Sequence, residues 1–206
     1  MELHGCNGCG STAIEALLDL AGVACRRRVF DWDDAEAWDR LRAVQPLAQV
    51  PTLVLDDGTV LTESAAIVLW IAERYPAARL LPSDPARRAL VYRWVVFFAT
   101  NVYVPVIVGD FPSRWVDGAV SQDSLKTHAL QRLRDAWQTF EAAIEPAPFL
   151  LGAERSALDV YVAMISRWRP GRGWLNEHCP KAMASIAVTE SDPIVAAVWA
   201  RNFPER

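Results

Sequence analysis

The sequence predicts an α/β domain built on a mixed four-stranded sheet, followed by an all-α domain. Strand and helix patterns alternate through the first 45 residues, a hairpin pattern and one further helix follow up to residue 75, and only helical patterns follow Pro85. The length of 206 residues fits two domains of modest size. We therefore expect a two-domain protein whose halves differ in secondary structure.

The composition is that of a globular protein with a large core. Hydrophobic residues make up 52% of the chain and charged residues 22%, values that exclude a disordered or coiled-coil protein. The net charge is -4 and the basic residues are scattered, so no nucleic-acid or anionic membrane partner is expected. The longest apolar run, residues 65–72, is far shorter than the ~18 residues that a membrane-spanning helix needs.

Cysteine usage and the first residues indicate the cytoplasm. The four cysteines, Cys6, Cys9, Cys25 and Cys179, are too few and too unevenly spaced for a secreted disulfide framework. The chain does not open with a basic start followed by an apolar stretch, so no secretory signal is expected. A reducing, cytoplasmic environment is the resulting prediction.

The first predicted elements are a strand, a loop of small residues and a helix. The opening residues have an extended character, residues 5–10 are rich in glycine, and a helical pattern begins at Ser11. Gly22 stands where a glycine that caps a helix C-terminus belongs. Apolar residues between them recur at intervals of three and four: Ile14, Leu17, Leu18 and Ala21.

The remaining strands of the sheet follow. Residues 25–30 predict a second strand and residues 35–44 a second helix, and this β-α-β-α order indicates parallel strands joined by crossover helices. Residues 52–55 and 59–61 flank Asp56-Asp57-Gly58, a turn typical of an antiparallel hairpin. Together these segments give the mixed sheet.

A third helix and a linker end the first domain. Residues 63–75 predict a helix that is apolar almost all round, as expected for a helix between a sheet and a second domain. Pro76 ends this helix, and Pro82 and Pro85 mark a linker. We therefore assign residues 1–77 to the first domain, 78–85 to the linker and 86–206 to the helical domain.

The second domain is predicted to consist of helices alone. Ser156 and Asp159 stand three positions apart before an apolar stretch, the pattern of a capping box, whose role is structural. The predicted helices cover residues 86–108, 122–144, 157–167, 180–190 and 193–202.

Two short segments could together hold a peptide. Pro51 stands at the start of a predicted strand, where a cis-proline would expose the backbone N–H and C=O of Val50. Glu63 and Ser64 begin a helix, whose N-terminus attracts a carboxylate. Taken alone, Pro51 is explained as an edge-strand proline, and Glu63 and Ser64 without Pro51 are better explained as an ordinary helix start.

These segments resemble the glutathione-binding half of a glutathione transferase, and the capping box with Leu151-Gly152 resembles the helical domain of that family. The resemblance implies a thioredoxin-like N-terminal domain, an all-α C-terminal domain, glutathione as co-substrate and a homodimer. It is carried by Gln49-Val50-Pro51-Thr52-Leu53, Asp57-Gly58, Leu61-Thr62-Glu63-Ser64-Ala65-Ala66-Ile67 and Trp70-Ile71-Ala72-Glu73-Arg74-Tyr75-Pro76.

The resemblance also implies roles for residues in glutathione binding. The Val50 backbone would pair with the cysteinyl part of glutathione as a short added strand. The Ser64 hydroxyl and the helix N-terminus would bind the γ-glutamyl carboxylate, while Glu63 would meet the α-ammonium group. The full predicted binding set is Gln49, Val50, Pro51, Glu63 and Ser64.

By analogy with bacterial members, three residues on the first long helix of the second domain are candidates to line the cleft between the domains. An alternative of equal standing is a polar stripe on a core helix. The three residues are Thr100, Asn101 and Tyr103.

The catalytic corner departs from the family pattern. Bacterial beta-type enzymes pair a Tyr on the first strand with a Cys at the helix start, but Gly5 and Gly10 occupy these positions here. Cys9 and Ser11 lie near the helix N-terminus, where the helix dipole favours an anion, and we rank Cys9 above Ser11 as the group that stabilises the glutathione thiolate. The alternative for Ser11 is an N-cap residue.

Cys6 and Cys9 also form a C-x-x-C motif between a strand and a helix, which predicts an alternative activity as a glutathione-dependent thiol–disulfide oxidoreductase. A third alternative, a non-catalytic binding module, follows from the glycines at the two donor positions. No metal site is expected, because His4 is the only further candidate ligand near the two cysteines.

Our preferred hypothesis is a glutathione transferase that activates the glutathione thiol for attack on a small hydrophobic electrophile. The attack would take place in a cleft between the two domains. The electrophile itself is not identified by the sequence, because apolar pocket residues do not distinguish one electrophile from another.

Overall fold

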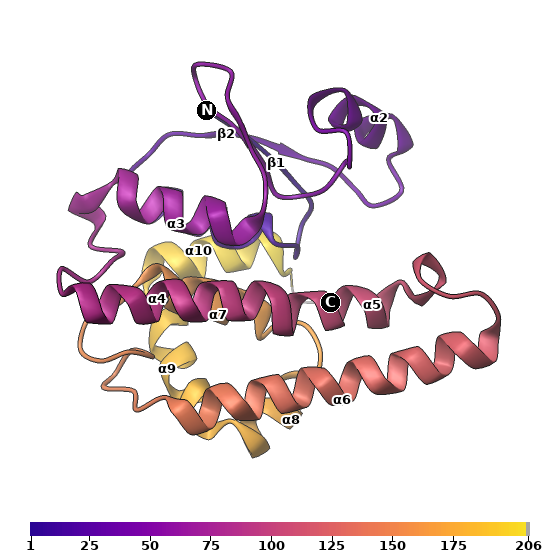
Figure 1. Cartoon of the computed structure of the whole chain (residues 1–206). Helices are drawn as coiled ribbons and strands as arrows, with labels where there is room; N and C mark the ends of the chain where they lie inside the picture. The colour runs from indigo at the N-terminus through magenta and orange to yellow at the C-terminus, as the bar shows by residue number, and fades with distance from the viewer. Residues whose placement is uncertain (205–206) are drawn as a thin grey trace.

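In the computed structural model, which describes residues 1–204, a mixed four-stranded sheet precedes a set of packed helices (Figure 1). The strand order is β2-β1-β3-β4. β1 (Glu2–Gly5) pairs in parallel with β2 (Arg26–Val29) and antiparallel with β3 (Thr52–Val54). β4 (Val60–Leu61) closes the sheet as the antiparallel partner of β3, so the predicted mixed sheet is confirmed.

Helices lie on both sides of this sheet (Figure 1). α3 (Ser64–Arg74) lies between the sheet and the remaining helices, and α1 (Ser11–Leu20) packs against α3, whereas α2 (Ala35–Val44) lies on the far side. Gly22, with φ +66°, ends α1 as predicted, because its N–H reaches the Asp19 carbonyl at 3.0 Å. The alternative that Ser11 is the N-cap is wrong, since Gly10 holds that position and Ser11 is the first helical residue.

A long helical rod follows an irregular segment. η1 (Pro76–Ala78), a turn of 3₁₀-helix, leads to residues 79–84, and the rod itself consists of α4 (Pro85–Phe97), the π-helical η2 (Phe98–Tyr103) and α5 (Val104–Asp110). The sequence predicted one regular helix here and missed the π-helical part. Over its 26 residues the rod is long and apolar enough to cross a membrane, a property that a core helix of a soluble protein can share.

The other helices complete the second half. One of them, α8, was not predicted, because seven residues are too few to show an apolar period. The remaining elements are η3 (Pro112–Arg114), α6 (Ala119–Ala143), α7 (Ala157–Ile165), α8 (Arg172–His178), α9 (Pro180–Glu190) and α10 (Pro193–Asn202).

α7 is the centre of the helical core. All nine of its residues are buried, and its N-terminus carries the predicted capping box between Ser156 and Asp159. One Asp159 carboxylate oxygen accepts the Ser156 N–H and hydroxyl at 2.8 Å, and the other accepts the Leu150 N–H at 2.8 Å.

A cluster of edge-to-face aromatic rings packs nearby: Trp94, Phe98, Trp137 and Phe140.

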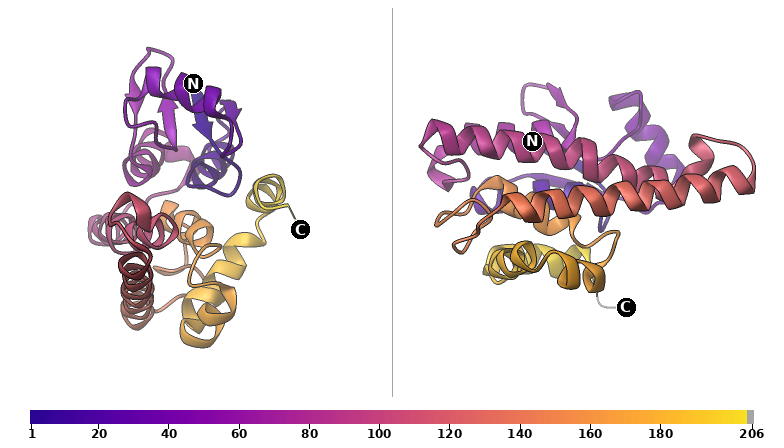
Figure 2. Two further views of the ribbon diagram at one scale, coloured as in Figure 1. Left: turned by 90° about the vertical axis from the view of Figure 1, so that its right-hand side faces the viewer. Right: turned by 60° about the horizontal axis from the view of Figure 1, so that its bottom comes forward.

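The last helix packs against the first. α10 lies beside α1, as the left view of Figure 2 shows. The buried Glu15 carboxylate on α1 accepts hydrogen bonds from Arg201 at 2.6 Å and from Asn202 at 3.1 Å. The Thr12 hydroxyl reaches the Asn202 side-chain oxygen at 3.1 Å. Polar contacts therefore join segments from opposite ends of the sequence.

Candidate functional site

The loop between β1 and α1 gathers three of the predicted site residues. The sulfur of Cys9 accepts the backbone N–H of Cys6 at 3.2 Å and lies 3.1 Å from the Ser11 hydroxyl oxygen. All three side chains are buried, Cys9 with 6% and Ser11 with 5% of their surface exposed. The Cys9 sulfur is thus held inside the loop by neighbouring donors.

Gly5 makes room for Ser11. A Cβ atom at position 5 would overlap the Ser11 hydroxyl, which therefore occupies the space of the missing side chain. The Ser11 hydroxyl also lies 3.4 Å from the Cys6 carbonyl oxygen. The Ser11 side chain is consequently directed back into the loop and bonded there.

The two cysteines differ in their acidity. The pKa of Cys9 lies below its ordinary value of 9.0, because the Cys6 thiol, the Ser11 hydroxyl and backbone N–H groups all donate toward its sulfur. The pKa of Cys6 lies above the ordinary value, because its thiol donates to Cys9 and is itself buried. Cys9 is therefore the anionic member of the pair and Cys6 its proton donor.

The segment ahead of β3 presents open backbone. The Val50–Pro51 peptide bond is cis, Pro51 is buried and Gln49 is exposed. The Thr52 hydroxyl donates to the Gln49 carbonyl at 2.7 Å, which fixes the turn. Within residues 1–204 the backbone N–H and C=O of Val50 have no hydrogen-bond partner, so they are available to an extended peptide.

The start of α3 lies against the second half of the chain. Ser64 is the first residue of α3, and the exposed Glu63 precedes it with φ +63°. The Ser64 hydroxyl lies 2.7 Å from the hydroxyl oxygen of Tyr161, a buried residue of α7. Burial raises the pKa of Tyr161, so its hydroxyl stays protonated.

Tyr161 was missed by the sequence reasoning. The one signal in the sequence was a tyrosine within a mostly apolar helix, since a buried phenol hydroxyl needs a partner. The pattern of a helix does not reveal which partner it finds. That partner, Ser64, comes from the other half of the chain.

Tyr103 is brought to the catalytic corner by the end of η2. A Cβ atom at Gly10 would lie 2.7 Å from the Tyr103 hydroxyl oxygen and 3.1 Å from Pro51 Cδ. The Tyr103 ring packs edge-on against Trp168, with centroids 4.8 Å apart. The Trp168 indole N–H donates in turn to the Gly8 carbonyl at 2.8 Å.

Thr100 and Asn101 are placed differently. The Thr100 hydroxyl is exposed and donates to the Val96 carbonyl of its own helix at 3.0 Å. The Asn101 amide donates to the Thr100 hydroxyl oxygen at 2.9 Å. Among residues 1–204 no hydrogen bond joins either side chain to the β1–α1 loop, so of the three candidates on this helix only Tyr103 reaches the loop.

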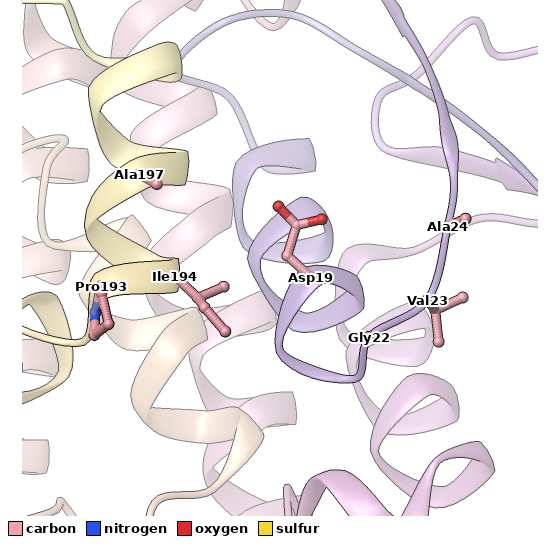
Figure 3. A pocket seen from close by; sticks show the side chains of 7 residues that line it. All are labelled: Asp19, Gly22, Val23, Ala24, Pro193, Ile194 and Ala197. Atoms are coloured by element: carbon pink, nitrogen blue, oxygen red, sulfur yellow. The ribbon is translucent and has the colours of Figure 1, made fainter.

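A surface hollow lies elsewhere, between the end of α1 and the start of α10 (Figure 3). It is open and shallow, with a volume of about 480 Å³, and its lining is mostly aliphatic. Its one charged lining residue, Asp19, is paired with Arg27 and Arg201. The candidate chemistry is therefore in the β1–α1 loop and not in this hollow.

Comparison with known proteins gives consistent matches. The sequence model of the glutathione S-transferase N-terminal domain matches residues 3–79. An uncharacterised glutathione S-transferase-like protein of Escherichia coli K12, YncG, is 29% identical over 204 residues, covering 98% of each chain. Glutathione S-transferase GstA of Escherichia coli O157:H7 is 29% identical over 137 residues, covering 65% of this chain and 63% of that one.

Solved structures match over almost the whole chain. A glutathione transferase homologue from Sulfitobacter, solved with bound glutathione, superposes with a TM-score of 0.85 at 24% identity and covers 97% of both chains. BphK, a bacterial enzyme of the same kind solved as a ternary complex, gives a TM-score of 0.79 at 25% identity, covering 98% of this chain and 99% of that one. The similarity therefore includes the helical half as well as the sheet.

Proposed function

Because this chain is a member of the glutathione transferase family, we propose that it binds glutathione and activates its thiol for attack on a small hydrophobic electrophile. The observation that supports this most directly is the open Val50 backbone beside the cis-Pro51 bond, close to the loop that holds Cys9. In the reaction, the thiol proton leaves, a carbon–sulfur bond forms and the electrophile loses its leaving group or opens.

Each part of glutathione has a proposed place. The cysteinyl part pairs with the Val50 backbone as a short added strand, next to Gln49 and Pro51. The γ-glutamyl carboxylate lies at the N-terminus of α3 near Ser64, whose hydroxyl is already oriented by Tyr161, and Glu63 meets the α-ammonium group.

We assign thiolate stabilisation to the N-terminal end of α1. Ser11 lies at this end and Cys9 adjoins it, where free N–H groups and the helix dipole favour negative charge; Cys9 donates to a bound sulfur only in its thiol form. A stabilised thiolate is the form of glutathione that attacks, so a lower thiol pKa raises the reactive fraction. The family further suggests a cytoplasmic homodimer, a proposal that size-exclusion chromatography with light scattering tests.

The first experiment is calorimetry with glutathione, followed in the same sample by an assay for conjugation to an aryl electrophile. Binding and turnover are the expected results. Ser64→Ala should weaken binding about tenfold through loss of one charge-assisted hydrogen bond. The exposed Ser124→Ala on α6 is the matched control. Absence of binding at millimolar glutathione contradicts the proposal, and binding without turnover indicates the non-catalytic binding module.

A second candidate function is supported by the low pKa of Cys9 beside the protonated Cys6. In this reaction the Cys9 thiolate attacks the glutathione sulfur of a mixed disulfide, forms its own mixed disulfide and releases the substrate thiolate. Cys6 then loses its proton and displaces glutathione to form a Cys6–Cys9 disulfide, which two further glutathione molecules reduce. Cys6→Ser should abolish the Cys6–Cys9 disulfide, leave the mixed disulfide on Cys9 to be reduced only by a further glutathione, and leave conjugation intact.

A further inference from the structure

The space that a side chain at position 10 would fill is taken by the hydroxyl of Tyr103, a residue from the second half of the chain. Gly10 has helical backbone angles, φ -58° and ψ -23°, so its backbone conformation does not require glycine. The requirement is steric, since a Cβ there would lie 2.7 Å from the Tyr103 hydroxyl oxygen and 3.1 Å from Pro51 Cδ. The Tyr103 hydroxyl thus lies beside the cis-proline against which the cysteinyl part of a bound peptide would pack.

Two features hold the Tyr103 ring in this position. Tyr103 is the last residue of the π-helical segment η2, and such a segment shifts the register of the residues that follow it. Trp168 packs edge-on against the ring, with 83° between the ring planes, and is itself tied to the loop by its hydrogen bond to the Gly8 carbonyl. The ring is therefore fixed to the same loop as Cys9.

The Tyr103 hydroxyl is a donor without an acceptor. Burial raises its pKa strongly, and the neighbouring Cys9, Tyr161 and Glu63 raise it further, while the Gly10 N–H opposes the rise. The phenol is therefore protonated at every pH where the protein would work. Within residues 1–204 the Tyr103 hydroxyl makes no hydrogen bond to an acceptor in the protein.

Cys9 and Ser11 are less free to act as donors. Their sulfur and oxygen atoms bond to each other at 3.1 Å, and the Ser11 hydroxyl also faces the Cys6 carbonyl. Both side chains are buried within the loop, whereas Tyr103 is only half-buried. The Tyr103 hydroxyl has no such partner among the described residues, so it is the freer donor for a bound thiol.

We propose that the Tyr103 hydroxyl donates a hydrogen bond to the sulfur of bound glutathione, and that Tyr103 is the catalytic residue that holds this sulfur as the thiolate. The inference deepens the proposed function and rests on it. Tyr103 would supply from the helical half the donor that Gly5 and Gly10 do not supply from the sheet half.

The test compares the wild type with Tyr103→Phe, which removes one oxygen and keeps the ring against Trp168. The readout is the ultraviolet absorbance of enzyme-bound glutathione thiolate as a function of pH. Loss of the donor should raise the apparent pKa of the bound thiol by about one unit, a tenfold loss of thiolate at neutral pH. Tyr103→Phe should therefore lower kcat about tenfold and change glutathione affinity less than about twofold.

Tyr92→Phe is the matched control, because the Tyr92 hydroxyl on α4 bonds to Glu73 away from the loop. Gly10→Ala is the second variant, since its Cβ displaces the Tyr103 hydroxyl and should produce the same shift in thiol pKa. An unchanged thiol titration in both Tyr103→Phe and Gly10→Ala, with the wild type active, overturns this inference alone. Failure of the wild type to bind glutathione overturns the proposed function as well.

Discussion

Two glycines determine which side chains meet in the loop after β1. Ser11 occupies the space beside Gly5, and Tyr103 occupies the space beside Gly10. Each glycine therefore leaves room for one neighbouring side chain, and this steric role does not involve a positive φ angle at either position. The candidate site is built from residues on the next helix and on a distant one.

A first prediction follows from the close approach at Gly10. Gly10→Ala should lower the free energy of unfolding by about 1–3 kcal/mol, because the added methyl overlaps the Tyr103 hydroxyl and crowds Pro51. Chemical denaturation measures the change. Gly173→Ala in α8, where a Cβ meets no atom within 4 Å among the described residues, should be neutral or stabilising by up to about 1 kcal/mol. Equal effects of the two substitutions would contradict the steric argument.

A second prediction concerns the Cys9 thiolate. In a pH titration by thiolate absorbance, one of the four cysteines should ionise below 9.0, because the pKa of Cys9 is lowered while those of Cys6, Cys25 and Cys179 are raised. Cys9→Ser should abolish this early step. Ser11→Ala should move it to higher pH by removing a donor.

The lowered pKa of Cys9 makes the free energy of unfolding depend on pH. The Cys9 thiolate stabilises the folded protein fully above the unfolded pKa near 9.0, and this contribution is lost as the pH falls through the folded pKa. The free energy of unfolding should therefore increase with pH across that interval. In Cys9→Ser the increase should be absent, and a persistent increase would show that another group is responsible.

For individual residues, the sequence predicted which loop forms the candidate site but not which side chains contact that loop. Cys9, Ser11 and Tyr103 were recognised as candidates because their positions follow from local patterns and from the family resemblance. Tyr161 was not assigned a place in the site, and Trp168 was considered only as pocket edge or surface, since their contacts with Ser64 and Gly8 join residues that lie far apart in sequence. A periodic pattern specifies the face of a helix and not the partner it meets.

Among the elements, α7 depends most on a single side chain. Asp159 accepts hydrogen bonds from three donors, the Leu150 N–H and the Ser156 N–H and hydroxyl, and is only 1% exposed. The capping box therefore fixes the loop before α7 as well as the helix start. This element was predictable, because the spacing of Ser156 and Asp159 is a local signal.

A third prediction is that Asp159→Ala lowers the free energy of unfolding by about 3 kcal/mol or more, because three buried donors lose their acceptor. Urea denaturation with far-ultraviolet circular dichroism provides the measurement. Asp123→Ala removes an exposed carboxylate on α6 that pairs only with Lys126 within the described residues, and should change stability by less than about 0.5 kcal/mol. A small effect of Asp159→Ala would contradict this account of α7.

The element that the sequence described least well is the rod from α4 to α5. Its length was predicted, but the π-helical turn of η2 was not, because one extra residue per turn leaves the apolar pattern almost unchanged. The same limit applies to α8, whose seven residues are too few for a period. The irregular part of the rod carries the candidate residue Tyr103.

For the whole molecule, the contact of α10 with α1 joins the sheet half to the helical half. Glu15, 5% exposed, accepts hydrogen bonds from Arg201 and Asn202 and forms an ion pair with Arg27, and Asp19 pairs with both arginines. The N-terminal side of α1 forms the candidate site. The position of that site therefore depends on the last described helix.

A fourth prediction tests this dependence. Glu15→Gln should lower the free energy of unfolding by about 2 kcal/mol. The loss is smaller than for a fully buried ion pair, because Arg27 and Arg201 both still pair with Asp19. Hydrogen exchange should show faster opening of α10 and of the N-terminal turn of α1. The exposed Glu145→Gln is the control, with an expected change below about 0.5 kcal/mol. Unchanged protection of α10 in Glu15→Gln would contradict the proposed dependence.

The contact between α10 and α1 has a consequence for the order of events during protein synthesis. A ribosome completes the sheet and α1 early, yet the helix that covers one side of α1 is made only after all the other described elements. Until α10 emerges, Glu15 has neither Arg201 nor Asn202 beside it, and the nascent sheet half exposes the surface that α10 later covers. Ribosome-bound chains that stop before Pro193 should therefore remain more sensitive to protease at α1 than released chains.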